Sequence, residues 1–469
     1  MSTSSVLENA APLPDGNFTH ASIAKQDTGD TSSDWSLPQK VGFRLASIFF
    51  ALTLLAPLDW KFWRELIHTN WAHFQDVFRL TAAVPQYSYA PKWGFASFRN
   101  VCLVLLVAAV GAAVWSYLDR NRRQYNVLYY WLRVLLRYRL AIGLIGYGLL
   151  QVFPVQFPKP TLSDLHTNYG DYLQWKLYYL TNGIAHADYE QATGLLEVLG
   201  GALLLWRTTA TIGAIISASL LFNIVLANFA YQLGDHVYAT LLLLAVSFLL
   251  AYDAPRLLNL LVFQRRAKAD RFQLSLPSRR AQQLRLALKS AVIVFLIFYT
   301  ASVAYGFRHT NWPLPDTAGT LKDSAGFYNV REFTVNGRTI PYSLTDPVRW
   351  QNVVFEKWNT ISVRSNRPLP IDVANPPIAY ESDQRKYEFA GNGGRRFYSY
   401  TADPASATLH LNGENDPHES ISFQYSYAPD GSLALTGADE SGNTLHVVLD
   451  KIDKQYLLNL GRRHPLTIY

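Results

Sequence analysis

The sequence predicts a membrane α-helical bundle of about seven transmembrane helices, followed by an antiparallel all-β domain, barrel-like or sandwich-like, outside the cytoplasm. Three observations lead to this fold class. Long apolar runs dominate the 469-residue chain up to about Arg308, and beyond it polar and aromatic residues alternate. Apolar runs of roughly 20 residues can cross a bilayer as helices, whereas a period of two is typical of strands. Finally, the lysines and arginines behind the net charge of +7 gather in connections between the apolar runs.

The candidate spans are residues 41–58, 97–118, 134–153, 188–206, 209–232, 237–254 and 290–307. The third is the weakest, because Arg133, Arg137 and Arg139 crowd its start. Residues 1–38 lack the basic and apolar segments of a signal peptide, and we expect a disordered cytoplasmic tail. Between the first two spans, within 39–124, residues 61–80 place apolar side chains at helical spacing. They predict an amphipathic helix at the outer membrane interface.

Lysines and arginines in short loops favour the cytoplasmic side. Three arginines lie at 119–123, Arg207 follows the fourth span, and the linker 263–289 is strongly basic. All three connections share one side if the N-terminus is cytoplasmic. The last span (290–308) then places the β-domain (309–469) outside. The linker is explained as a topology determinant that contacts anionic lipid, with a cytoplasmic partner site as the alternative. The basic excess thus points to the lipid bilayer and not to nucleic acid.

Glu197 lies inside the fourth span and shares one helical stripe with Glu190, Gly194 and Gly201. Small residues let helices approach closely. This stripe is therefore expected to face the bundle interior and not lipid.

Depth along the helices predicts the partners of the Glu197 carboxyl group. At about 1.5 Å per residue, Tyr147 and Asn223 come within a turn of its depth. A second polar layer toward the outer end consists of Glu190, Asn228, Gln151 and Asp235. Three roles for Glu197 stay open. In the first, it is a neutral, hydrogen-bonded group that fixes helix register. In the second, it is a proton relay or lines a transport path. In the third, it forms a hydrogen bond to a quinone or another small ligand.

Six histidines fall near the outer face under this topology: His68, His73, His166, His186, His236 and His309. None lies deep in a span, which disfavours a haem held between two helices. The candidate outer-face site is His186, His236 and Asp235, although ordinary interfacial histidines explain the pattern as well. Cys102 is the one cysteine, which excludes an intrachain disulfide and a CxxC redox pair. No metal site is predicted.

Two glycines, Gly143 and Gly146, precede a longer loop and the segment EVLGGALLLWRTTATIG at 197–213, in which a Glu-x-x-Gly-Gly helix meets an inner turn. The segment LFNIVLANFAYQ (221–232) follows. With these features, residues 125–262 resemble the DoxX-type four-helix membrane fold. DoxX-like proteins are bacterial and archaeal membrane proteins, and some are described as subunits of thiosulfate:quinone oxidoreductase. The resemblance implies the bacterial cytoplasmic (inner) membrane, a quinone as the cofactor of such a subunit, and a membrane or extracytoplasmic redox partner.

The C-terminal segment begins with a hairpin signal, since Asn336-Gly337 suits a type I′ turn between 327–335 and 338–343. Further strands are predicted at 350–356, 360–365, 387–390, 397–401, 407–413, 420–427, 432–437 and 443–452. Short sequential strands favour a meander that closes into a barrel, or a sandwich. His410, His418 and His446 are scattered and no GxSxG motif is present, so a binding module is expected here and not a catalytic domain.

Three functions follow. The first is a membrane bundle that presents an outer β-domain and assembles with partners. The second is the membrane subunit of a quinone-linked oxidoreductase, and the third is a proton-coupled carrier that uses the Glu197 stripe. The sequence contains no complete catalytic motif, and an enzymatic role is at most that of a redox-complex subunit.

Overall fold

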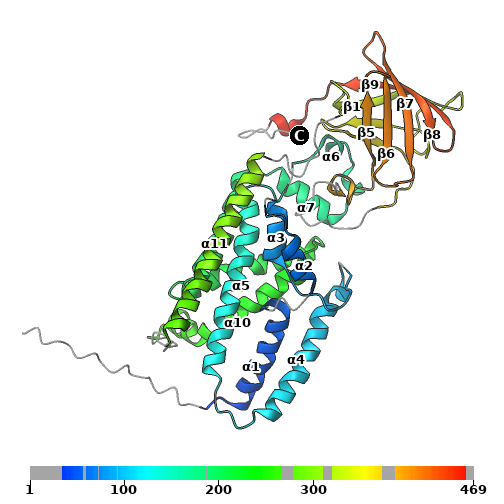
Figure 1. Cartoon of the computed structure of the whole chain (residues 1–469). Helices are drawn as coiled ribbons and strands as arrows, with labels where there is room; N and C mark the ends of the chain where they lie inside the picture. The colour runs from blue at the N-terminus through cyan, green and yellow to red at the C-terminus, as the bar shows by residue number, and fades with distance from the viewer. Residues whose placement is uncertain are drawn as a thin grey trace, which may run out of the picture.

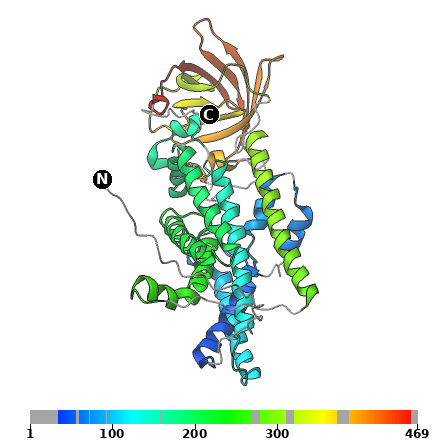
Figure 2. The same cartoon turned by 90° about the vertical axis from the view of Figure 1, so that its left-hand side faces the viewer.

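The computed structural model describes residues 34–55, 60–71, 73–91, 93–157, 159–185, 187–266, 278–309, 319–371 and 386–460. The long helices form one bundle, and the C-terminal strands form a barrel beyond one end of it (Figure 1). The barrel stays at this end when the molecule is turned by 90° (Figure 2).

The bundle contains α1 (Leu37–Phe50), continued by the π-helix η1 (Ala51–Leu55), α4 (Arg99–Leu118), α5 (Asn126–Val152), α8 (Ala187–Leu204), α9 (Ala210–Ala230), α10 (His236–Leu261) and α11 (Arg279–His309). Each expected run overlaps one of these helices. In the part of the chain that the structure describes, four are long and apolar enough to cross a membrane: α4 with its 3₁₀ turn η2 (Phe95–Phe98), α9, α10 and α11. The chain therefore has a membrane-type helical part.

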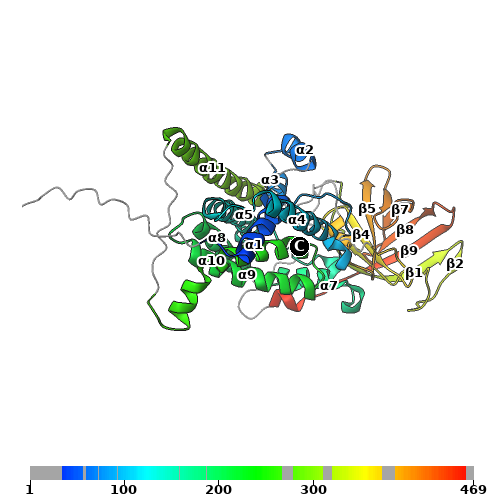
Figure 3. The same cartoon turned by 90° about the horizontal axis from the view of Figure 1, so that it is seen from below.

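Helix α5 is the centre of the bundle, in contact with α1, α3, α8, α10 and α11, and the view from below shows it among these helices (Figure 3). Its arginines bind groups inside the bundle. Arg139 donates hydrogen bonds to the carbonyls of Leu54, Thr81 and Ala83, at 3.2, 2.9 and 2.9 Å. Arg137 Nε donates to the carbonyl of Leu204 at 3.0 Å. These carbonyls end helices and lack intrahelical partners, which explains why an apolar helix tolerates these arginines.

Glycines bring α5 and α8 into close contact. A Cβ atom on Gly194 would lie 2.6 Å from the carbonyl oxygen of Gly148 and 2.7 Å from the backbone nitrogen of Val152. On Gly201 it would lie 3.1 Å from the carbonyl oxygen of Ala141. Glu190, Gly194, Glu197 and Gly201 are all buried. The prediction that this stripe faces the bundle is therefore confirmed.

The single amphipathic helix predicted at 61–80 is two helices, α2 (Trp60–His68) and α3 (Phe74–Ala82). α2 exposes Trp60 and Trp63. α3 instead buries its apolar face against α5 and α11. The reason is a matching surface, because Gly306 of α11 leaves room for the ring of Phe74. The structure thus divides the predicted segment into an exposed helix and a helix that packs against the bundle.

Both predicted edges of the bundle shift. Ser36 and Gln39 form a capping box at the start of α1, so ordered structure begins before residue 39, whereas 1–33 lie outside the described residues. α11 begins at Arg279 and not at 290, because the basic residues 279–289 are mostly good helix formers and continue the helix. Residues 267–277 of the predicted linker lie outside the described residues.

The barrel consists of β1 (Gly326–Val335), β3 (Asn352–Phe355), β4 (Thr360–Arg364), β5 (Arg396–Asp403), β6 (Thr408–Gly413), β7 (Ser420–Tyr427), β8 (Leu433–Asp439) and β9 (Thr444–Ile452). Consecutive strands pair antiparallel, and β1 also pairs with β9, so the sheet closes without an edge. The short β2 (Arg338–Thr339) forms the predicted hairpin with β1. Asn336 and Gly337 have φ values of 50° and 77°, as a type I′ turn requires.

Alternate residues of the strands fill the barrel with apolar side chains, including Phe333, Phe355, Leu409 and Phe423, each at most 1% exposed. The predicted strand at 387–390 is instead a short helix, α12 (Lys386–Phe389). It is anchored by Glu388, whose carboxylate accepts hydrogen bonds from Trp358 Nε1 and Thr360 Oγ1. A buried tertiary partner thus overrides the strand pattern of this segment.

Buried polar contacts join the barrel to the loop between α5 and α8, which includes α6 (Leu162–Leu165) and α7 (Gln174–Gly183). The Glu356 carboxylate accepts hydrogen bonds from the backbone nitrogens of Leu162 and Ser163, at 3.2 and 2.7 Å, and so caps α6. Arg395 donates to the carbonyl of His166 at 3.2 Å and to Ser362 Oγ at 2.7 Å. Burial raises the pKa of Glu356 to about 7 and lowers that of Arg395 to about 9.

The ring of His166 is part of this junction. It stacks on Phe327 with centroids 3.8 Å apart, and its Nε2 lies 2.7 Å from Tyr456 Oη. Burial, followed by the charges of Lys454 and Arg395, lowers the pKa of His166 to about 3. His166 is therefore neutral when the barrel is docked.

Replacing Gly194 by Ala should destabilise the bundle by about 1–3 kcal/mol, because the added methyl group meets backbone atoms that cannot move aside. The matched control is Gly42→Ala in α1, where a Cβ atom meets nothing within 4 Å. Thermal unfolding of the purified variants measures both effects. Equal melting temperatures for the two variants would contradict the close α5–α8 contact.

The docked form binds a proton on His166 more weakly than the unfolded chain does, so this residue contributes stability above pH 6.5 that is lost as the pH falls toward 3. Replacing His166 by Gln should remove this pH-dependent contribution. The expected difference between wild type and variant changes by about 1–2 kcal/mol from pH 7 to pH 5. Glu356 acts in the opposite sense, since its raised pKa makes docking weaker as the pH rises from 4.5 to 7. Comparison with the variant cancels this contribution. Parallel melting-temperature profiles of the two proteins would refute the assignment.

Candidate functional site

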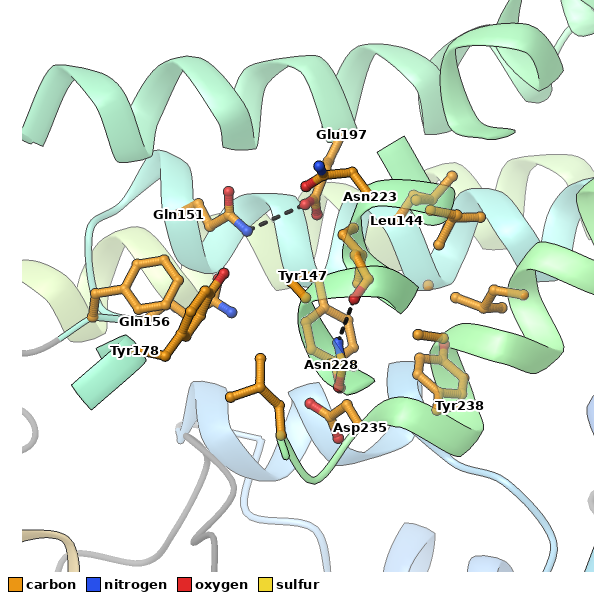
Figure 4. A pocket seen from close by; sticks show the side chains of 18 of the residues that line it. Leu144, Tyr147, Gln151, Gln156, Tyr178, Glu197, Asn223, Asn228, Asp235 and Tyr238 are labelled. Atoms are coloured by element: carbon orange, nitrogen blue, oxygen red, sulfur yellow. Dashed lines mark hydrogen bonds between the residues drawn. The ribbon is translucent and has the colours of Figure 1, made fainter. Parts of the chain in front are cut away.

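A polar pocket lies inside the bundle at the end that carries the barrel. Its walls come from α5, α8, α9, the start of α10, residues 156–157 and α7, and it measures about 770 Å³ including the part that opens to solvent. Figure 4 shows the carboxyl, amide and phenol groups that converge on it. The sequence-predicted residues that line it are Tyr147, Glu197, Asn223, Asn228 and Asp235, together with Gln151 of the second polar layer. Residues from three separate spans and one loop thus meet at one place.

Glu197 is buried, at 5% exposure. Its Oε1 accepts a hydrogen bond from Gln151 Nε2 at 3.2 Å (Figure 4). The Thr193 hydroxyl lies 2.8 Å from Gln151 Oε1, which turns the amide nitrogen toward Glu197. Depth alone had predicted Tyr147 and Asn223 as partners. Gln151 is the partner instead, because the Gly148–Gly194 contact brings its turn of α5 against α8.

Asp235, at the entry to α10, lies on another wall of the pocket and interacts electrostatically with Tyr147. Burial raises the pKa of Asp235, and the interaction with the Tyr147 hydroxyl opposes that rise. Burial also raises the pKa of Tyr178 and Tyr179, which enter from α7. These phenols therefore line the pocket as neutral hydroxyl groups.

Two amide oxygens in the pocket have no hydrogen-bond partner among the described residues. Asn228 is 4% exposed; its Nδ2 donates to the carbonyl of Ile224 at 2.9 Å, and its Oδ1 is unpartnered. Gln156 Oε1 is buried and unpartnered as well. A buried acceptor without a donor costs free energy. These oxygens, with Glu197, favour a ligand that donates hydrogen bonds.

The pocket also reaches the outer surface of the bundle. Asn223 lines it and yet has an exposed side chain on α9, between Phe222 and Leu226, which are 58% and 53% exposed. A polar residue on an otherwise apolar helix surface is expensive in lipid unless it marks a path or a site. At the other side, a larger recess of about 2420 Å³ shares Tyr179, Asp235 and Tyr238 with the pocket.

The other predicted residues lie elsewhere. Glu190 is buried outside the pocket lining, where its Oε1 accepts a hydrogen bond from the backbone nitrogen of Phe157 at 3.4 Å. His236 Nε2 lies 2.7 Å from Ser97 Oγ, and its Nδ1 lies 3.1 Å from the carbonyl of Leu233, so the ring is held against η2. His186 lies outside the described residues. Of the three residues predicted for the outer-face site, His186, His236 and Asp235, only Asp235 is seen to line the pocket.

The donor set suits an organic ligand better than a metal ion. Among the residues that the structure describes, no three His, Cys, Asp or Glu side chains lie close enough to hold a metal. Sequence reasoning missed Gln156, Tyr178, Tyr179 and Tyr238. The loop that folds back over the bundle supplies the first three, and no helix periodicity could have placed them. Tyr238 stacks on Tyr147 at 5.9 Å, a contact that only helix packing reveals.

Replacing Glu197 by Gln should leave the bundle intact, since a glutamine oxygen can still accept the hydrogen bond from Gln151. Replacing it by Leu should destabilise the protein by about 1–3 kcal/mol, because the buried Gln151 amide loses its acceptor. Detergent-solubilised melting temperatures and the yield of monodisperse protein measure both effects. If Gln were as disruptive as Leu, the neutral hydrogen-bonded role of Glu197 would be wrong.

The chain is similar to the uncharacterized protein YwoB of Bacillus subtilis (strain 168), with 30% identity over 122 residues, which cover 26% of this chain and 76% of YwoB. No family model matches the chain. No solved structure matches it at a significant level.

Proposed function

The chain belongs to the same family as YwoB, whose name gives no activity. We therefore propose a function from the geometry of the pocket. The protein is an integral membrane binding protein. It takes up a lipid-soluble molecule whose polar head donates hydrogen bonds, and it holds that head between Glu197 and Asn228. The barrel is its docking domain for partners outside the membrane.

One observation supports this proposal above all others. Buried acceptors without donors, chiefly Asn228 Oδ1, line a pocket that extends to the exposed Asn223 on an apolar helix surface. A water-soluble ligand has no reason to use an opening on such a surface. A molecule that partitions into lipid reaches it by lateral diffusion, and its head group then replaces the missing donors.

In this proposal all seven long helices cross the bacterial cytoplasmic membrane. Arg137 and Arg139 do not exclude α5 as a span, since helix-end carbonyls accept their hydrogen bonds. The N-terminus is cytoplasmic and the barrel extracytoplasmic, as the basic loops favour. Residues 125–262 form a DoxX-like core, and α1, α4 and α11 are additions around it.

A quinone-linked redox subunit is the second candidate. A quinol has two hydroxyl donors, which match a carboxyl group and an amide oxygen in one pocket. Glu197 and the Tyr147–Asp235 pair would position its hydroxyl groups. The described residues bring no cysteine framework or metal cluster, so electrons would pass to a partner subunit. A proton-coupled carrier is the third candidate, because Glu197 lies in the bundle interior.

The test is purification of the full chain from native membranes in mild detergent, followed by extraction and mass spectrometry of bound small molecules. We expect a lipid-soluble compound with hydroxyl or amine donors near one equivalent per chain. A quinone with a co-purifying oxidoreductase subunit would select the redox candidate. Protein without any bound compound, even after incubation with excess ubiquinol or menaquinol, would contradict ligand binding.

The variant Asn228→Leu should lose the compound and keep its fold, since Oδ1 is unpartnered and the substitution removes only the hydrogen bond from Nδ2 to the Ile224 carbonyl. Ser217→Ala is the matched control. Ser217 lies on the same helix and also has an unpartnered buried oxygen, but it is not part of the pocket lining. Equal amounts of bound compound in the two variants would rule out the Asn228 site.

A further inference from the structure

A second pocket lies at the opposite end of the bundle and differs in charge from the first. It is lined by the first turns of α5 and α9, the end of α10 and the turn at 207–208, and it measures about 1110 Å³ including its open part. Four arginines line it, namely Arg133, Arg137, Arg207 and Arg256, and they face one carboxylate, that of Asp253.

That carboxylate is already neutralised by one of the arginines. Arg256 Nη2 lies 3.0 Å from Asp253 Oδ1, and the Thr211 hydroxyl donates to Asp253 Oδ2 at 2.7 Å. Within the described residues, neither Arg133 nor Arg137 pairs with a carboxylate. Arg133 and Arg137 therefore add positive charge to the pocket that no carboxylate of the described residues pairs with.

The arginines are held in place by other contacts, which makes the pocket a built site. The guanidinium of Arg133 lies 3.3 Å from the ring centroid of Tyr252, and its Nε is buried without a hydrogen-bond partner among the described residues. Arg137 is fixed through Nε to the carbonyl of Leu204, which leaves its Nη groups for a ligand. An unpartnered buried donor beside fixed cations indicates a missing acceptor.

The start of α9 adds backbone donors to the pocket. Thr208, Ala210 and Thr211 line it, and the first turn of the 21-residue helix α9 begins there. Amide groups of a first turn have no intrahelical acceptor and attract anions. Guanidinium groups bind phosphate oxygens through paired, charge-assisted hydrogen bonds.

We propose that this pocket binds a phosphate group, and that the ligand is a phosphate ester such as the head of an anionic phospholipid. Basic pockets between membrane helices on the cytoplasmic side are suited to such heads. The site is independent of the Glu197 pocket, and its ligand is an anion where that pocket favours a hydrogen-bond donor.

The experiment compares thermal unfolding of the full chain in nanodiscs of phosphatidylcholine alone and with increasing phosphatidylglycerol, and in detergent with inorganic phosphate. We expect saturable stabilisation of the wild-type protein. Stabilisation by phosphatidylglycerol but not by millimolar inorganic phosphate identifies a lipid head. Equal stabilisation by inorganic phosphate identifies a soluble phosphate ester.

Arg133→Gln should raise the ligand concentration that gives half-maximal stabilisation by about ten-fold, since a charge-assisted hydrogen bond is lost. Arg285→Gln is the matched control, because Arg285 is exposed on the early turns of α11 and does not line the pocket. If Arg133→Gln fails to fold, Arg133→Lys keeps the charge and removes the fork, and it should give a smaller loss. No response to either probe, or the same response in the Arg133 and Arg285 variants, would overturn the proposal.

Discussion

The contact between α5 and α8 through Gly148 and Gly194 is the constraint on which the polar interior of the bundle depends. Side chains at these positions would collide with backbone atoms of the facing helix. Their absence brings the helices close enough for Gln151 to reach the carboxyl group of Glu197. In an apolar bundle a polar group is stable only where its partner is within hydrogen-bond distance. The glycines therefore explain why a carboxyl group is tolerated in this helix and where its partner lies.

The same requirement organises the rest of the molecule. Arg139 occupies the carbonyls that end η1 and α3, and so fixes those segments against α5. At the junction with the barrel, Glu356 caps α6 and Arg395 binds the carbonyl of His166, so the barrel is attached through buried polar groups. Such groups leave unsatisfied partners behind when they separate. The barrel and the loop above the pocket are therefore positioned together, although the chain between them is long.

Local patterns predicted much of this structure. The seven apolar runs, the inward stripe around Glu197 and the Asn336-Gly337 hairpin all follow from short-range periodicity and turn chemistry. The strand pattern at 387–390 failed because a tertiary contact of Glu388 decides that segment. Depth along the helices correctly predicted that Glu197, Tyr147 and Asn223 line one pocket. It did not predict the hydrogen-bond partner of Glu197, since that partner depends on the rotation of each helix about its axis. Gln156, Tyr178 and Tyr179 come from a loop, and its path over the bundle is a property of the whole fold.

The two pockets use the two ends of one helix. Tyr147 and Gln151 of α5 line the acceptor-rich pocket near the barrel, whereas Arg133 and Arg137 line the basic pocket. Arg137 and Tyr147 are ten residues apart in the helix, or about 15 Å. Coupling between sites requires an element with two arrangements that both ligands bias. The glycine contact leaves α5 no room to slide or rotate against α8. Occupation of one pocket should therefore leave the affinity of the other unchanged.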